Sequence, residues 1–175
     1  PAANDIWAST FHSACVRILR RDIEKLGFAS SFTIYDTDDS LRVVKDCLKD
    51  LNLDDKQFPP RSVLGYISRA KDEMKLADDY LAECEKAGDF RLTRIAKIYG
   101  EYQRRLWEAN ALDFDDIILH TVRLLQKFDD VREYYQKKFR YVLIDEYQDT
   151  NHLQYLLAST LAGGYENFCV VGDDD

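Results

Sequence analysis

The chain has 175 residues, of which 46% are hydrophobic and 32% are charged, a composition typical of a soluble globular protein of one domain, or of one domain with an insertion. Its uncharged runs are far shorter than the roughly 20 residues of a membrane span, and no secretory signal opens it, so we expect a cytoplasmic protein that makes no membrane contact. The formal net charge of −8, taken alone, argues against a nucleic-acid partner.

The negative charge is concentrated near the C-terminus. Residues 1–110 contain 18 Lys and Arg against 19 Asp and Glu, whereas residues 111–175 contain 6 against 13. The first part is therefore nearly balanced and can carry a local basic face. The four cysteines are dispersed and include no Cys-x-x-Cys pair, so we expect reduced, mostly buried thiols and neither zinc nor a disulfide framework: Cys15, Cys47, Cys84 and Cys169.

The N-terminal region predicts a strand followed by a basic helix. Residues 5–11 (DIWASTF) are rich in Ile, Trp, Thr and Phe, which favours a strand. Ser13 is a suitable N-cap for the helix that follows, and Gly27 is a suitable stop. The arginines fall mainly opposite the apolar side of this helix, where they either face solvent or contact a phosphate or a neighbouring subdomain: Arg17, Arg20 and Arg21.

Residues 30–110 predict a purely helical region with the character of an insertion. A strand-like stretch over 31–36 leads to Asp36 or Thr37, either of which can cap a helix that ends near residue 51. Pro59-Pro60 breaks the chain before a helix over 62–74, and two more helices follow over 78–86 and 90–109. The last of these is predicted to have one aromatic face, formed by Phe90, Ile98, Tyr102 and Trp107.

Beyond residue 110 the pattern changes to that of a parallel α/β sheet. Asp113 can cap a helix over 112–128, and a shorter helix over 131–139 follows. The strands predicted over 141–145 and 167–173 are apolar and flank a helix over 151–162, as in a parallel sheet buried on both faces. The expected fold class is therefore α/β, with a mainly α-helical inserted subdomain.

The first of these strands ends in two adjacent carboxylates, Asp145 and Glu146. Because like charges repel, either the strand surfaces there with both acids solvated, or a cation lies beside them. Ligands of parallel α/β sheets bind at the carboxyl ends of strands, where an Asp can hold Mg²⁺ and a neighbouring Glu can activate a water. The strand pattern alone leaves both interpretations open.

Four motifs, in family order, resemble those of the superfamily 1 helicases of the UvrD/Rep/PcrA group. The sequence YVLIDEYQDT over 141–150 resembles motif II, the Walker B variant, and TFHS over 10–13 resembles motif Ib. LDFDDII over 112–118 resembles a short motif upstream of the Walker B strand, and VVGDDD over 170–175 resembles the start of motif III. The resemblance spans essentially the whole chain and implies a partial RecA-like parallel sheet of a P-loop NTPase, interrupted by a helical subdomain.

The resemblance implies roles in a nucleotide site. Asp145 would bind Mg²⁺, Glu146 would be the catalytic base for ATP hydrolysis, Gln148 would sense the γ-phosphate or its water, and Asp173 would lie near the same site. Residues 1–29 and 111–175 would be parts of motor domain 1A, and 30–110 would be subdomain 1B. No Gly-x-x-x-x-Gly-Lys-Ser/Thr occurs in the 175 residues, so the family's Walker A loop is missing.

The same resemblance implies a path for single-stranded DNA. Thr10, Phe11 and His12 would line it, with hydroxyl and backbone donors for phosphate and a ring for stacking. Lys71, in the segment ISRAKDEM with Ser68 and Arg69, resembles a family segment near the duplex, although a solvated helix face fits this segment equally well.

The acids of the LDFDDII motif could suggest a second metal site: Asp113, Asp115 and Asp116. Helix capping by Asp113 and solvation of the other acids at a helix N-terminus is the simpler interpretation.

The predicted function is a fragment of an ATP-dependent 3′–5′ DNA helicase that couples ATP hydrolysis to movement along single strands and to duplex unwinding in repair or replication. ATP and Mg²⁺ would be its cofactors, and its partners would be single-stranded DNA, the junction with duplex DNA and the remaining domains of the same chain. Without the Walker A loop, this piece alone is expected to be inactive. A helical module that binds DNA or protein, a subunit of a helicase–nuclease, and RNA in place of DNA all remain open.

Overall fold

The computed structural model describes residues 11–138, 142–145, 152–163 and 168–171, with the backbone alone at residue 11 and in the last strand pair. The chain forms two compact units, and the sequence of one is inserted in that of the other. We call Ser31–Asp116 the helical unit, and Pro1–Ser30 together with Ile117–Asp175 the terminal unit. The helical unit ends at Asp116, whereas the sequence prediction ended the insertion at residue 110; the assignment of the two units to subdomains 1B and 1A stays a prediction.

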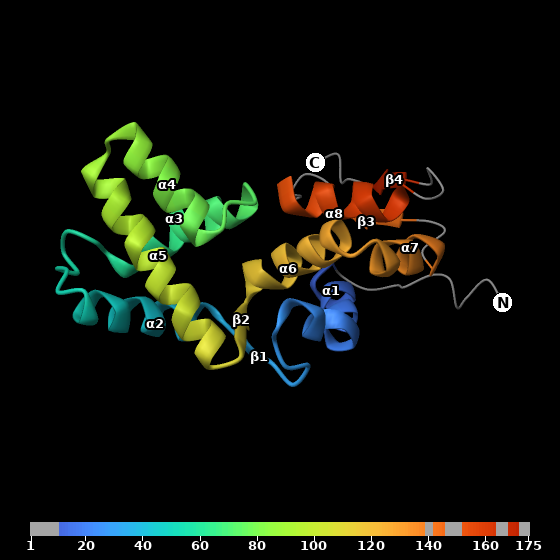
Figure 1. Cartoon of the computed structure of the whole chain (residues 1–175), viewed down its shortest axis with the longest axis horizontal. Coiled ribbons are helices and arrows are strands. Elements are labelled where there is room, and N and C mark those ends of the chain that lie inside the picture. Colours follow the sequence, from blue (N-terminus) through green and yellow to red (C-terminus); the bar gives the residue numbers. More distant parts are fainter. Residues whose placement is uncertain (1–10, 139–141, 146–151, 164–167, 172–175) are drawn as a thin grey trace. The chain divides into compact units, whose positions relative to one another are not determined.

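The helical unit contains four helices and a short parallel strand pair (Figure 1). The helices are α2 (Thr37–Asp50), α3 (Pro60–Asp72), α4 (Ala77–Ala87) and α5 (Phe90–Glu108). Strand β1 (Thr33–Tyr35) runs parallel to β2 (Ala111–Asp113), with Thr33 opposite Ala111 and Tyr35 opposite Asp113. The extended stretch before α2 is thus confirmed, but the region is not purely helical, because β1 pairs with residues just beyond residue 110.

Local signals set the helix ends of the helical unit. Asp36 is the N-cap of α2: its side chain accepts the N–H of Asp39 at 2.8 Å, and the Asp39 side chain accepts the N–H of Asp36 at 3.2 Å. Pro60 occupies the first turn of α3, where its missing N–H leaves no hydrogen bond unmade. Gly88 ends α4 with φ of 71°, and the side chain of Asp89 caps α5 through the N–H of Leu92.

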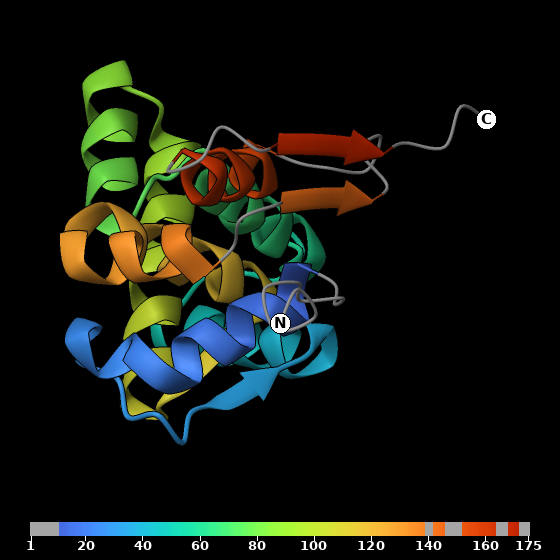
Figure 2. The same ribbon diagram turned by 90° about the vertical axis from the view of Figure 1, so that its right-hand side faces the viewer.

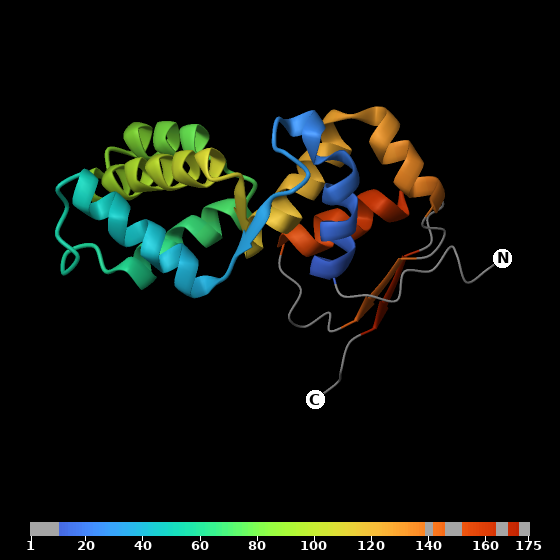
Figure 3. The same ribbon diagram turned by 90° about the horizontal axis from the view of Figure 1, so that it is seen from below.

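The core of the helical unit lies between α2, α3 and α5, whose buried residues include Val44, Ile67, Ile95, Tyr99 and Tyr102. Figure 3 shows α4 and α5 side by side.

The predicted aromatic face of α5 is only half right. Ile98 and Tyr102 are buried, but Phe90 is 86% exposed and Trp107 is 50% exposed. Both lie outside the stripe of buried residues that recurs every three or four positions along α5.

The terminal unit contains α1 (Phe11–Asp22), a 3₁₀ turn η2 (Ile23–Leu26), α7 (Asp129–Lys138) and α8 (His152–Ala162). Helix α6 (Phe114–Lys127) begins in the helical unit and continues into the terminal unit. Strands β3 (Val142–Asp145) and β4 (Phe168–Val171) are parallel and flank α8 in sequence, which confirms the strand–helix–strand prediction. Over the residues that the structure describes, the fold is thus mainly helical, with two small parallel strand pairs.

The predicted start of the N-terminal helix needs correction. Helix α1 already includes Phe11, so Ser13 lies inside the helix and is not its N-cap; residues 5–10 of the predicted strand lie outside the described residues. The predicted stop is confirmed, because Gly27 closes η2 with φ of 94°. Arg20 donates to the carbonyl of Ser30 at 2.7 Å.

Side-chain contacts join α1 to α7 in the terminal unit. The hydroxyl of Tyr135 donates to Asp22 at 3.2 Å, and the guanidinium of Arg21 stacks 3.7 Å from the ring centre of Tyr134. Cys15 is fully buried, as is Cys47 of the helical unit, and Cys84 of the same unit is also buried. Cys169 lies in a strand of which only the backbone is described. In the described part of the chain, no helix has the length and apolar character needed to cross a bilayer.

Candidate functional site

One residue of the predicted nucleotide site, Asp145, lies in the parallel pair β3–β4. The two strands run side by side in the same direction (Figure 2), with Asp145 opposite Val171 at their carboxyl ends. Asp145 is therefore the last residue of its strand, at the edge where parallel α/β sheets bind ligands. The other predicted nucleotide-site residues lie outside the described residues: Glu146, Gln148 and Asp173.

The predicted DNA contacts of the TFHS motif lie at the start of α1. Thr10 is outside the described residues, Phe11 is the first helical residue, and His12 follows it with a half-buried side chain. The arginines downstream are engaged within the unit, since Arg20 and Arg21 make the contacts given above. Arg17 is exposed on the same helix.

Lys71 is not where the sequence suggested. Its side chain is 0% exposed, and its ammonium lies 2.7 Å from Asp113 and 2.9 Å from Asp116. The solvated helix face weighed for this segment is therefore wrong for Lys71, whereas its role in nucleic-acid binding stays a prediction. The expectation of solvated acids at the start of α6 is also wrong for Asp116, which is fully buried.

Lys71, Tyr102, Asp113 and Asp116 form what we call the buried ionic cluster. The hydroxyl of Tyr102 donates to Asp113 Oδ2 at 2.7 Å, on the oxygen that also faces Lys71 Nζ. The two aspartates cap α6 reciprocally: the N–H of Asp116 donates to Asp113 Oδ1 at 2.8 Å, and the N–H of Asp113 donates to Asp116 Oδ2 at 3.2 Å. The predicted capping role of Asp113 is thus confirmed, with Asp116 as its partner.

Burial and charge act against each other in this cluster. Burial alone would lower the pKa of Lys71, but Asp113 and Asp116 together raise that pKa well above its usual value. Burial also opposes ionisation of Asp113, yet Lys71 and the Tyr102 hydroxyl hold its pKa below the ordinary value. Burial and the neighbouring Asp113 raise the pKa of Asp116 to about 7. Lys71 and Asp113 are therefore the firmly charged pair, and Asp116 exchanges its proton near neutral pH.

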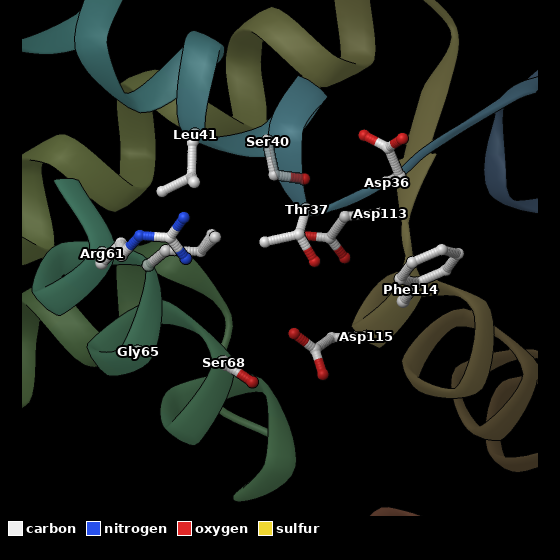
Figure 4. A pocket seen from close by; sticks show the side chains of 11 residues that line it. Asp36, Thr37, Ser40, Leu41, Arg61, Gly65, Ser68, Asp113, Phe114 and Asp115 are labelled. Atoms are coloured by element: carbon white, nitrogen blue, oxygen red, sulfur yellow. The ribbon is translucent and has the colours of Figure 1, made fainter.

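A cavity of about 370 Å³ opens beside the cluster, entirely within the helical unit. Figure 4 shows its three walls: the start of α2, one face of α3 and the turn from β2 into α6. Arg61 projects from α3 on one side, and Phe114 and Asp115 lie on the other. Phe114 is 47% exposed, so its ring is accessible at the edge of this cavity.

Sequence reasoning missed this cavity. The motif LDFDDII contained the signal, because an aromatic residue stands between two acids that cap one helix. The walls contributed by α2 and α3 could not be inferred from that motif. Among the described residues, no cluster of three or more His, Cys, Asp or Glu side chains is arranged to hold a metal, so the second metal site weighed for the motif has no support there.

One compact unit inserted in another, with a parallel strand pair that ends in Asp, defines an α/β domain that carries a helical insertion. The sequence profile of the UvrD/REP helicase N-terminal domain matches residues 1–175. The chain belongs to this family, as the four motifs indicated.

Curated relatives agree with this assignment. The chain is 49% identical to the ATP-dependent DNA helicase PcrA of Bacillus subtilis over 175 residues, which is all of this chain and 23% of the relative. It is also 49% identical over 173 residues to the PcrA helicases of Staphylococcus epidermidis and Staphylococcus aureus, which again covers 99% of this chain and 23% of theirs. The chain therefore spans about a quarter of the length of these relatives.

Proposed function

We propose that this chain is part of an ATP-dependent DNA helicase that moves 3′ to 5′ along single-stranded DNA in the cytoplasm and opens duplex DNA in repair or replication. The observation that carries the proposal is the match to the helicase N-terminal domain over all 175 residues, together with 49% identity to helicases named PcrA. The remaining domains of the same chain would complete the motor and supply the phosphate-binding loop.

The terminal unit would form part of a RecA-like motor domain and hold the nucleotide edge. Asp145 would bind Mg²⁺: it ends a parallel strand at the ligand-binding edge, and a carboxylate is the ligand type that this ion favours. Glu146 would take the proton of the attacking water, and Gln148 would respond to the γ-phosphate, with Asp173 nearby. The bound ion would neutralise charge on the phosphates, while these side chains orient the water and accept its proton.

Each unit would offer its own contacts for DNA: the start of α1 in the terminal unit and the cavity in the helical unit. Thr10 and His12 offer polar groups to phosphate, and Phe11 offers a ring. Phe114 adds a half-exposed aromatic ring on which a base can stack, and Arg61 offers a charge for a phosphate. Single-stranded DNA and its junction with duplex are the proposed partners.

The test uses the full-length protein that contains this sequence. Its ATP turnover is measured with and without a single-stranded oligonucleotide, for the unmodified protein and for Glu146→Gln. We expect DNA to stimulate turnover, and Glu146→Gln to lower the stimulated rate about 10²–10⁴-fold while nucleotide binding is retained, since it removes the base alone.

Glu133→Gln is the matched control, because Glu133 is an exposed acid on α7. The proposed function would be contradicted if DNA did not stimulate ATP turnover by the unmodified protein. It would also be contradicted if Glu146→Gln kept the unmodified rate of ATP turnover.

A further inference from the structure

The buried ionic cluster joins two parts of the helical unit that lie far apart in sequence. Lys71 is near the end of α3, and Asp113, 42 residues later, is the cap of α6. Tyr102 adds a third element, α5, through its bond to the same carboxylate. The start of α6 is therefore fixed to two other helices by short polar contacts.

Two members of the buried ionic cluster, Asp113 and Asp116, flank Phe114 in sequence. Asp113 and Asp116 are buried and bonded to each other, and the two residues between them, Phe114 and Asp115, line the cavity. With both ends of this turn anchored, the position of the Phe114 ring over the cavity is set by the anchors. A shift of α6 along its axis would separate Lys71 from at least one of the two carboxylates.

A buried ionic cluster stabilises a core inefficiently, because removing its charges from water costs free energy. Replacing a buried ion pair by apolar residues of similar volume is often neutral or stabilising, so the charges are not needed for stability as such. One ammonium between two carboxylates instead fixes how the helices that carry these groups lie relative to one another. Any other arrangement would leave a buried charge without its partner, which costs free energy. The cluster thus acts on the geometry of the turn.

We propose that Lys71 is a positioning residue for single-stranded DNA: through Asp113 and Asp116 it holds the first turn of α6 so that the Phe114 ring is presented to a base. The inference rests on the proposed function and adds to it a residue that never touches the DNA. Lys71 thereby keeps a part in DNA binding, by a route different from the phosphate contact that the sequence suggested.

The test uses the full-length protein and a charge-balanced variant, Lys71→Met with Asp113→Asn and Asp116→Asn. This variant leaves no unpaired buried charge, and Asn retains the ability to cap a helix, so thermal unfolding should stay close to that of the unmodified protein. We expect the concentration of oligo(dT) that half-saturates ATP turnover to rise about tenfold, in line with the loss of one base–aromatic stack. Turnover at saturating DNA should change less than about twofold, because the nucleotide site is not altered.

A second comparison distinguishes positioning from general stability. Phe114→Ala alone should raise the half-saturating DNA concentration by a similar factor, and combining it with the triple variant should add little, because both remove the same contact. Lys75→Met is the matched control: Lys75 lies just past α3, pairs with Glu73 and Glu83, and is partly exposed, so this variant should leave DNA affinity unchanged.

A folded triple variant with unmodified DNA affinity would overturn the inference, as would full additivity with Phe114→Ala. If the triple variant does not fold, Asp116→Asn alone keeps the Lys71–Asp113 pair; a rise of about threefold supports the inference and no rise overturns it. A full-length protein whose turnover is insensitive to single-stranded DNA would instead remove the proposed function itself.

Discussion

The two small parallel sheets of this protein share a sequence pattern but differ in how their acids are used. Strand β2 ends at Asp113 and is followed by two more acids, and strand β3 ends at Asp145 and is followed by Glu146. In the helical unit the protein supplies the cation itself, since Lys71 lies between two of the carboxylates. At β3 the proposed function assigns that role to Mg²⁺. Acids after a strand therefore do not identify a metal site until the source of the compensating charge is known.

Neutralising Asp145, the terminal acid of β3, should have the largest effect. Asp145→Asn in the full-length protein should lower DNA-stimulated ATP turnover at least about a hundredfold and leave thermal unfolding unchanged, because it removes a ligand for the ion that balances phosphate charge. Turnover measured over a range of Mg²⁺ concentrations checks this. Asp130→Asn, at an exposed acid paired with Lys25, is the control and should keep normal turnover; equal losses in the two variants would remove the contrast.

Two lysines of the helical unit give the second test. Lys71→Met should destabilise this unit by about 3–5 kcal/mol, because it leaves two buried carboxylates without their cation. Lys75→Met should cost only about 0–1 kcal/mol, because its partners are exposed and screened by water. Chemical denaturation of the 175-residue chain measures both, and equal effects would show that the cluster has no special place in the core.

The pH dependence of stability isolates Asp116. Its pKa is about 7 in the folded protein and near 4 when unfolded, so between these values the folded state binds more protons than the unfolded state. The free energy of unfolding should therefore fall as pH rises from about 4 through 7. In Asp116→Asn this part of the pH dependence should disappear, as denaturation at pH 5 and pH 7.5 would show; an unchanged slope would mean that other groups produce it.

A smaller effect than that of Lys71→Met is expected at a helix cap that has no buried partner. Asp89→Ala removes the acceptor for the N–H of Leu92 at the start of α5 and should cost about 1 kcal/mol. Asp113→Ala should cost more, because it also removes one partner of Lys71. Denaturation of the two variants gives this ranking, and the reverse order would show that capping outweighs the ionic contacts.

The sequence predicted most of the helices, because their signals are local. Asp36, Pro60 and Gly27 act within one turn of the residues that they cap or stop, and the structure has each of them in that role. The α5 face was less well predicted, since two of its four residues are exposed. The parallel arrangement of β3 and β4 followed from two apolar strands on either side of one helix. The family could be predicted from four sequence motifs, because their order and residue types can be recognised without knowledge of the fold.

The partners of the LDFDDII acids depended on the tertiary structure. Nothing near Asp113 in sequence indicates that a lysine 42 residues earlier lies against it, or that a tyrosine from α5 shares the same oxygen. The cavity could not be predicted either, because three segments that are separated in sequence form its walls. Helix capping depends on residues that are close in sequence, so it can be predicted from the sequence alone. The compensation of a buried charge depends on residues that are close in space, and only the tertiary structure brings these together.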